Sequence, residues 1–110
     1  MPKILKQNKT LMLVSLAMKA GKVASGEFST EKAVKQRQAK LVMVSGEASD
    51  NTKKRFQDMC TYYQVPICFY GSKAELGSAI GKEFRASLAV VDIGLADAIK
   101  KSLCSTEEWR

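Results

Sequence analysis

The 110-residue chain alternates between two spacings of hydrophobic residues. Apolar positions three and four residues apart are typical of amphipathic helices, and short continuous apolar runs are typical of buried strands. Helical spacing predicts helices over residues 8–20, from Gly26 or Ser29 to Arg37, over 50–63, over 73–80, and around Leu95, Ile99 and Leu103. Between them lie a short extended piece at 22–25 and apolar strands at 41–44, 66–70 and 88–91.

Residues typical of helix ends support these boundaries. Ser49 and Asp50 are suitable N-caps for the third helix. Ser72 and Glu75 have the spacing of a capping box, and Gly81 is placed to end the fourth helix. Residues 105–110 read as a polar tail after the last helix.

The first two helices are predicted to be buried along defined faces. The broad apolar arc of the first combines one face, Leu13, Leu16, Ala17 and Ala20, with the flanking Leu11, Val14 and Met18. So broad an arc predicts a well-buried helix. The second helix aligns Thr30, Ala33, Val34 and Arg37 on one face.

Helices and strands alternate along the whole chain, and no linker or repeat interrupts them. That order favours an α/β fold in which helices cover both faces of a sheet of about four strands. The strands are apolar at nearly every position, which fits coverage on both sides. We therefore predict one domain over residues 1–110.

The positive charge of the chain is concentrated in its first 40 residues. That stretch holds nine basic and two acidic residues and nets +7, which equals the formal net charge of the whole chain. Such an asymmetry indicates a polyanionic partner, either nucleic acid or an anionic membrane surface. A solvated basic face without a partner is the other reading.

A membrane-spanning segment is not expected. The longest apolar stretch, Leu11 to Met18, contains Ser15 and is far shorter than a bilayer span. Lys3 and Lys6 precede it as in a signal peptide, but no small-residue cleavage pattern follows. We expect a cytoplasmic protein with no membrane partner.

Residues for catalysis or metal binding are scarce. The chain has no histidine, and its three cysteines form no C-x-x-C pair, so we expect no zinc site, no cofactor and no enzyme. Cys60 and Cys68 fall within apolar patterns and are expected in the core. The run from Gly77 to Lys82 lacks the spacing of a phosphate-binding loop.

The segment from Lys22 to Lys35 is the most informative for binding. An extended piece leads through Gly26 into a helix, whose first N–H groups and partial positive charge suit phosphate or base-edge contacts. Lys32 and Lys35 add charge along the same helix. Phe28 either stacks on a base or contributes to the core.

Several short segments then follow in a recognisable order: Gly26, Lys32-Ala33-Val34, Ala39 to Val44, Asn51-Thr52-Lys53, Tyr63 to Ile67, and Ser72 to Lys82. Over about Leu11 to Ile99 the chain resembles the ribosomal-protein family of kink-turn RNA binders, L7Ae and L30e, and its small bacterial members. The resemblance implies a three-layer α/β/α sandwich with a mixed four-stranded sheet. It also implies a structured RNA partner, ribosomal or messenger, and association with the ribosome.

The resemblance also implies where RNA binds. Family members read tandem sheared G·A pairs with a helix start of pattern Gly-x-Asn-Glu-x-x-Lys, which falls on Gly26 to Lys32, with Phe28 and Ser29 at the Asn and Glu positions. Their apolar loop before the last strand packs on the extruded nucleotide. The implied RNA-binding residues are Lys22, Gly26, Glu27, Phe28, Ser29, Lys32, Lys35, Phe84, Arg85 and Ala86.

The leading hypothesis is a monomeric, non-catalytic RNA binder. The alternative is a protein-interaction module on the same fold, which uses its basic face to bind an acidic protein. A small enzyme is a weaker third reading, because histidine and metal-ligand spacings are missing.

Overall fold

The structure, a computed structural model, describes the backbone of residues 2–108 and the side chains of residues 9–103. Helices and strands alternate in the order α1 (Pro2–Lys19), β1 (Val23–Ser25), α2 (Glu27–Lys35), β2 (Leu41–Val44), α3 (Asp50–Tyr63), β3 (Ile67–Phe69), α4 (Lys73–Ala79), β4 (Ser87–Val90) and α5 (Ile93–Glu108). Each predicted helix and strand is present.

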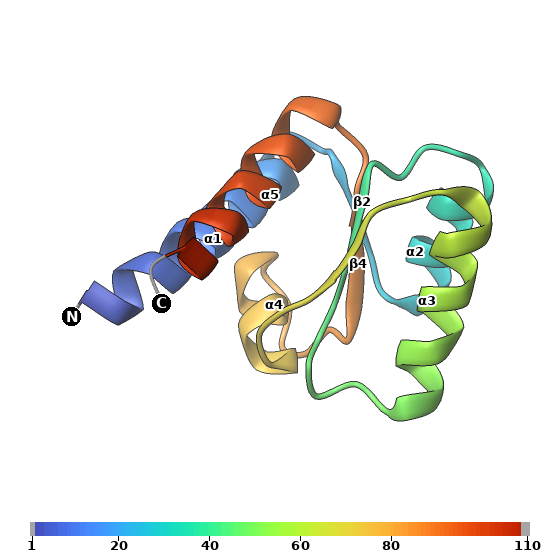
Figure 1. Cartoon of the computed structure of the whole chain (residues 1–110), viewed down its shortest axis with the longest axis horizontal. Helices are drawn as coiled ribbons and strands as arrows, with labels where there is room; N and C mark the ends of the chain where they lie inside the picture. Colours follow the sequence, from blue (N-terminus) through green and yellow to red (C-terminus); the bar gives the residue numbers. More distant parts are fainter. Residues whose placement is uncertain (1, 109–110) are drawn as a thin grey trace.

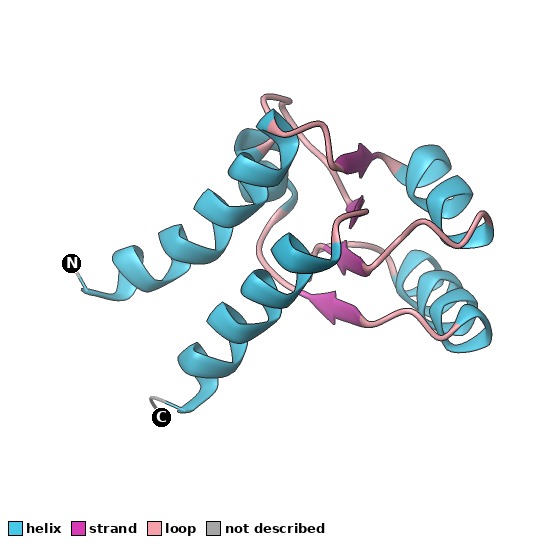
Figure 2. Cartoon of the chain, turned by 90° about the horizontal axis from the view of Figure 1, so that it is seen from above, coloured by secondary structure: helices cyan, strands magenta, loops and turns pink. Residues whose placement is uncertain are grey.

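The four strands form one mixed sheet in the order β1-β4-β2-β3. The last strand of the chain, β4, lies between β1 and β2 and is antiparallel to both, whereas β2 and β3 are parallel. Helices α2 and α3 cover one face, and α1, α4 and α5 cover the other (Figures 1 and 2). The α/β/α sandwich with a mixed four-stranded sheet is confirmed.

Each central strand supplies both halves of the core. Along β2, Leu41 and Met43 pack under α1, α4 and α5, while Val42 and Val44 pack under α2 and α3. All four side chains are at most 1% exposed. The apolar run seen in the sequence therefore reflects a strand with no solvent-facing side.

The predicted buried face of α1 is wrong in part. The fully buried positions are Thr10, Val14 and Ala17, whereas Leu16 is 54% exposed and Ala20 lies beyond the helix. The reason is that α1 packs along a narrow stripe against α5, where the hydroxyls of Thr10 and Ser102 share a buried 2.7 Å hydrogen bond. A polar residue thus belongs to the buried stripe, although hydropathy alone favours apolar positions there.

Several element boundaries differ from expectation. Helix α1 begins at Pro2 rather than at residue 8. Helix α5 continues to Glu108, so much of the expected polar tail is helical, and its side chains and that of Cys104 lie outside those described. Strand β3 begins at Ile67, after Pro66, which lacks the N–H needed for a ladder. Arg37 lies beyond α2 rather than on its buried face, with φ of 62°.

The helix caps agree with the sequence. The Ser49 hydroxyl accepts a hydrogen bond from the Thr52 N–H, and Ser72 and Glu75 form a complete capping box. Gly81, with φ of 77°, follows the end of α4 in the conformation that favours glycine.

The two described cysteines pack in the interior as expected. Cys60 is 1% exposed and Cys68 packs against the core on the opposite face of the sheet. Burial raises the pKa of the Cys60 thiol to about 11 and that of Cys68 to about 12. Both thiols are therefore protonated and unreactive at neutral pH. Within the described chain, no helix is long and apolar enough to cross a bilayer.

The loop before β4 rests directly on α4 at Gly77. A Cβ added at Gly77 would lie 2.7 Å from the backbone carbon and oxygen of Glu83 and 2.8 Å from the Phe84 nitrogen. Such distances are shorter than van der Waals contact, so a side chain here displaces the loop.

We therefore expect Gly77→Ala to destabilise the fold by about 1–3 kcal/mol in urea unfolding, as overpacking does elsewhere. The matched control is Gly94→Ala in α5, where a new Cβ would lie no closer than 3.4 Å to the Asp92 carboxylate. That change is expected to be neutral or stabilising, by up to about 1 kcal/mol, because alanine favours helices. Equal stability of the two variants would contradict the tight contact at Gly77.

Candidate functional site

The start of α2 and the loop before β4 meet at one end of the sheet. The Gly26 N–H donates to the Ser87 carbonyl over 3.0 Å, which continues the β1–β4 ladder to this junction. A Cβ at Gly26 would lie 3.9 Å from Arg85 Nε, and Gly26 has φ of 91°. Glycine at this position thus permits the turn into α2, whereas the distance to Arg85 would leave room for a Cβ.

Helix α2 begins without a side-chain cap. Gly26 is the N-cap and offers no side-chain acceptor to the first N–H groups of the helix. These donors, together with the positive end of the helix dipole, are available to an external acceptor such as a phosphate or carbonyl oxygen.

The loop that faces this helix start is held by backbone hydrogen bonds. The Arg85 N–H donates to the Lys73 carbonyl over 3.0 Å, and the Ser45 N–H donates to the Ala86 carbonyl over 2.8 Å. Contacts from α4 and from the end of β2 therefore fix the path of residues 84–86. Ala86 packs against the core, the Phe84 ring is exposed, and Arg85 Nη1 donates a 2.8 Å hydrogen bond to the Phe84 carbonyl.

Unpaired polar atoms gather at the same junction. Among the described residues, the buried side-chain nitrogens and oxygens without a hydrogen-bond partner are Thr30 Oγ1, Arg85 Nε and Ser87 Oγ. Leaving such a group unpaired costs about 1–3 kcal/mol. Thr30 and Ser87 are fully buried, whereas Arg85 is partly exposed, so its guanidinium is the one that a ligand reaches.

Four charges on α2 and α3 neutralise one another. Arg55 of α3 forms ion pairs with both Glu27 and Glu31, and Glu31 also pairs with Lys35 over 2.7 Å. The hydrogen bond from Lys35, aided by the charge of Arg55, lowers the pKa of Glu31. Lys32, by contrast, makes no ion pair among residues 9–103, and its charge is uncompensated.

Two aromatic rings flank the junction in solvent. Phe28 is 78% exposed and Phe84 is 61% exposed. The first lines a hollow of about 300 Å³ with Glu31, Lys32, Lys35 and Gln36. Phe28 therefore does not contribute to the core, which was one of its two predicted roles. Two exposed aromatic rings near one junction are typical of a binding surface.

The structure brings together most of the predicted site residues. Gly26 to Ser29 and residues 84–86 adjoin, and Lys32 and Lys35 follow along α2. Lys22 does not join them, because it precedes β1 and lies at the other end of that strand from Gly26.

Sequence reasoning missed Arg55 and the buried Thr30 and Ser87 at this site. The ion pairs of Arg55 leave no local pattern in the sequence, because Glu31 and Glu27 lie 24 and 28 residues before it. Only the three-dimensional packing of the two helices shows that Arg55 neutralises the acids of α2.

Comparison with known proteins shows the family to which this chain belongs. The sequence profile of the ribosomal protein L7Ae/L30e/S12e/Gadd45 family matches residues 8–100. The chain belongs to this family.

Curated L7Ae-family relatives cover most of the chain. RNA-binding protein YlxQ of Bacillus subtilis is 45% identical over 87 residues, 79% of this chain and 87% of that protein. Large ribosomal subunit protein eL30 of Trypanosoma brucei brucei is 35% identical over 86 residues, 76% of this chain and 82% of that protein.

Solved structures share the L7Ae-family fold. A protein of unknown function from Bacillus halodurans superposes with a TM-score of 0.84 at 36% identity, over 87% of this chain and 97% of that one. The Giardia lamblia 15.5kD RNA binding protein superposes with a TM-score of 0.73 over 89% of this chain and 84% of that one, and at 22% identity it supports the fold alone.

The ion pairs of Glu31 in this L7Ae-family site predict how its carboxyl group titrates. In Lys35→Gln, the pKa of Glu31 is expected to rise toward its ordinary value, as followed by NMR of the side-chain carboxyl carbon. Lys32→Gln is the matched control on the same helix, and it is expected to shift the pKa less.

The depressed pKa also sets a sign for stability. Because the folded-state pKa of Glu31 lies below its unfolded value, its stabilising contribution is present above the unfolded pKa and is lost as pH falls through the folded pKa. Both lysine variants giving the same Glu31 titration would contradict the assigned pairing.

Proposed function

We propose that this protein is a non-catalytic RNA-binding protein that recognises sharply bent, kink-turn-like RNA at the junction of α2 with the loop before β4. The observation that carries the proposal is the uncapped α2 N-terminus at Gly26, which adjoins the unpaired Arg85 Nε. Its L7Ae-family relatives include proteins named as RNA-binding and as large ribosomal subunit proteins, which supports the same partner. The ligand that we propose is a bent segment of ribosomal or messenger RNA in the cytoplasm.

Each part of the junction has a role in this proposal. Backbone N–H groups at the start of α2 donate to phosphate or base-edge oxygens, and Lys32 and Arg85 neutralise phosphates. Bent RNA exposes unstacked bases, which stack on aromatic rings, and Phe28 and Phe84 offer such rings on either side of the junction.

The contacts at Phe28 and Ser29 differ from the family pattern of Asn and Glu. A serine hydroxyl gives or accepts one hydrogen bond, and a phenyl ring gives none. We therefore propose that this chain recognises the bend mainly by shape and stacking, with fewer hydrogen bonds to guanine edges.

The proposal includes no chemical step. Among the described residues, no group of three histidine, cysteine, aspartate or glutamate side chains is placed to hold a metal ion. The acids of α2 beside the junction, Glu27 and Glu31, are paired with Arg55. The first N–H groups of α2 and the Arg85 guanidinium are hydrogen-bond donors at the junction, and they suit binding of an anion.

The deciding measurement is a gel-shift titration against a kink-turn RNA and an unkinked duplex of equal length. We expect tighter binding to the kinked RNA, with log affinity falling by about 0.7 to 0.9 per neutralised phosphate for each unit of log salt. Equal affinity for the two RNAs would leave only non-specific electrostatics. No binding to either would favour the protein-interaction alternative, in which the basic face binds an acidic protein.

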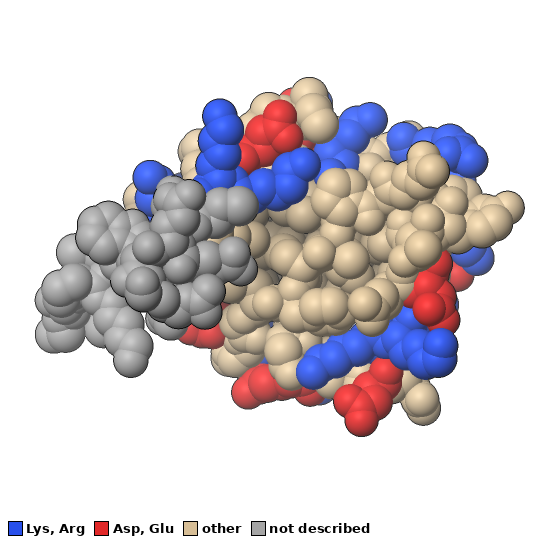
Figure 3. All heavy atoms as spheres, viewed as in Figure 1, with Lys and Arg blue, Asp and Glu red and all other residues tan. Residues whose placement is uncertain are grey.

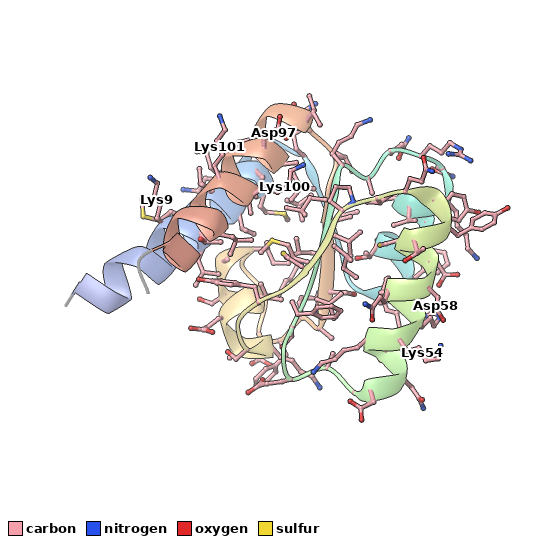
Figure 4. All side chains as sticks on the ribbon, viewed as in Figure 1. Lys9, Lys54, Asp58, Asp97, Lys100 and Lys101 are labelled. Carbon is pink, nitrogen blue, oxygen red and sulfur yellow. The ribbon has the colours of Figure 1, made fainter. Side chains whose placement is uncertain are left out.

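Lys32→Ala tests the position of the surface. Because Lys32 is uncompensated, its removal is expected to weaken binding at every salt concentration and to reduce the salt slope by about 1. Lys101→Ala is the matched control, since Lys101 is exposed on α5, across the sheet from α2 (Figure 4). Unchanged binding by the Lys32 variant, or equal losses in both variants, would contradict this placement of the RNA.

A further inference from the structure

Three hollows that share lining residues lie beside α2 and the segment that follows it. The first, of about 300 Å³, contains Phe28 and shares Lys32 and Gln36 with the second, also of about 300 Å³, beside β1. The second shares Gln38 and Val91 with a third hollow of about 440 Å³. We use the name α2 track for five polar residues of this path: Lys32, Gln36, Arg37, Gln38 and Lys40.

The α2 track is positively charged and its cations are uncompensated. Lys32, Arg37 and Lys40 make no ion pair within residues 9–103. The acid beside its first hollow, Glu31, is neutralised by Lys35 and Arg55. These three charges are therefore available to a polyanion.

The acid nearest the far end of the track has another role. Asp92 follows the end of β4, and its carboxylate accepts a 2.9 Å hydrogen bond from the Leu95 N–H, which caps α5. Lys and Arg side chains lie at several places along the upper edge of the molecule in Figure 3, with a group of acidic side chains among them, and α3 ends and β2 begins at this edge in Figure 1. The far end of the track thus lies at an edge with several basic side chains.

Arg37 is an unusual residue for its backbone position. It follows the C-cap of α2 with φ of 62°, a left-handed conformation in which glycine is the residue usually found. Its N–H donates to the Val34 carbonyl over 3.0 Å, so this conformation is part of the helix end. A strained arginine where glycine fits without strain points to a use for the side chain.

The side chain of Arg37 is also held in place. Its guanidinium carbon lies 5.4 Å from the centre of the Tyr63 ring, within the range of a cation–π interaction. A guanidinium stacked on a ring keeps its N–H donors along its edges, where they match phosphate oxygens. The residue is therefore prepared to bind a phosphate before RNA arrives.

We propose that the α2 track binds the sugar–phosphate backbone of an RNA strand that continues beyond the bend at Gly26. This inference rests on the proposed function, because it concerns the same RNA. Gln36 and Gln38 lie between the cations in sequence and supply hydrogen bonds to riboses or bases along the track.

The test uses a kink-turn RNA with long helical arms and the same RNA with one arm shortened at a time. Arg37→Gly and Lys40→Gln are each expected to weaken binding to the long-armed RNA by about three- to tenfold and to lower its salt slope by about 1. With the arm on the track removed, the variants and the wild type are expected to bind alike. Lys32→Ala weakens binding to every RNA in the set.

The glycine variant separates binding from folding. Because glycine adopts the left-handed conformation without strain, Arg37→Gly is expected to keep or raise the thermal midpoint while it lowers affinity. Lys54→Gln on α3 is the control, because it removes the same single positive charge. Lys54 pairs with Asp58 on α3, away from the track (Figure 4). The control is expected to leave affinity and salt slope unchanged.

The two proposals fail in different ways. If the wild type binds the kinked RNA and the Arg37 and Lys40 variants match it in affinity and salt slope, the track is overturned and the junction at Gly26 stands. Equal losses in the Lys54 control would also overturn the track, as a general effect of charge. If the wild type does not prefer kinked RNA, the proposed function fails and the track fails with it.

Discussion

The backbone hydrogen bond from Gly26 to the Ser87 carbonyl determines the arrangement of the candidate site. It joins the residue after an edge strand to the first residue of the last strand, although the two are 61 positions apart in the sequence. Because β4 lies between β1 and β2, the loop that leads into it must end beside α2. The mixed sheet therefore brings an uncapped helix and an arginine-bearing loop together, and neither segment alone has this combination.

Coverage of both sheet faces accounts for how the sequence predicted the fold. Leu41 to Val44 is apolar throughout because alternate residues enter opposite halves of the core, and the capping residues at Ser49 and Ser72 act locally. Such signals can be read directly from neighbouring residues. The burial of Thr10 on α1 was not predicted, because it depends on Ser102 of a helix far away in the sequence.

The same distinction applies to the candidate site. Gly26 and Lys32 were identified because a helix start and its charges are local features. The neutralisation of Lys35 was not, since it depends on a glutamate shared with Arg55 from another helix. Nor was the separation of Lys22 from the junction, which follows from the direction of β1. The charge of a segment was predictable from sequence, whereas the share of that charge left for a ligand required the structure.

Because of the contact at Gly77, the path of the loop before β4 does not depend on which side chains the loop carries. The loop backbone lies against a helix residue that has no side chain, so its course is set by contact between two main chains. Phe84 and Arg85 project from that course and contribute little to the core. Substitutions at these two positions are therefore expected to leave the packing of the core unchanged, because the course of the loop does not depend on their side chains.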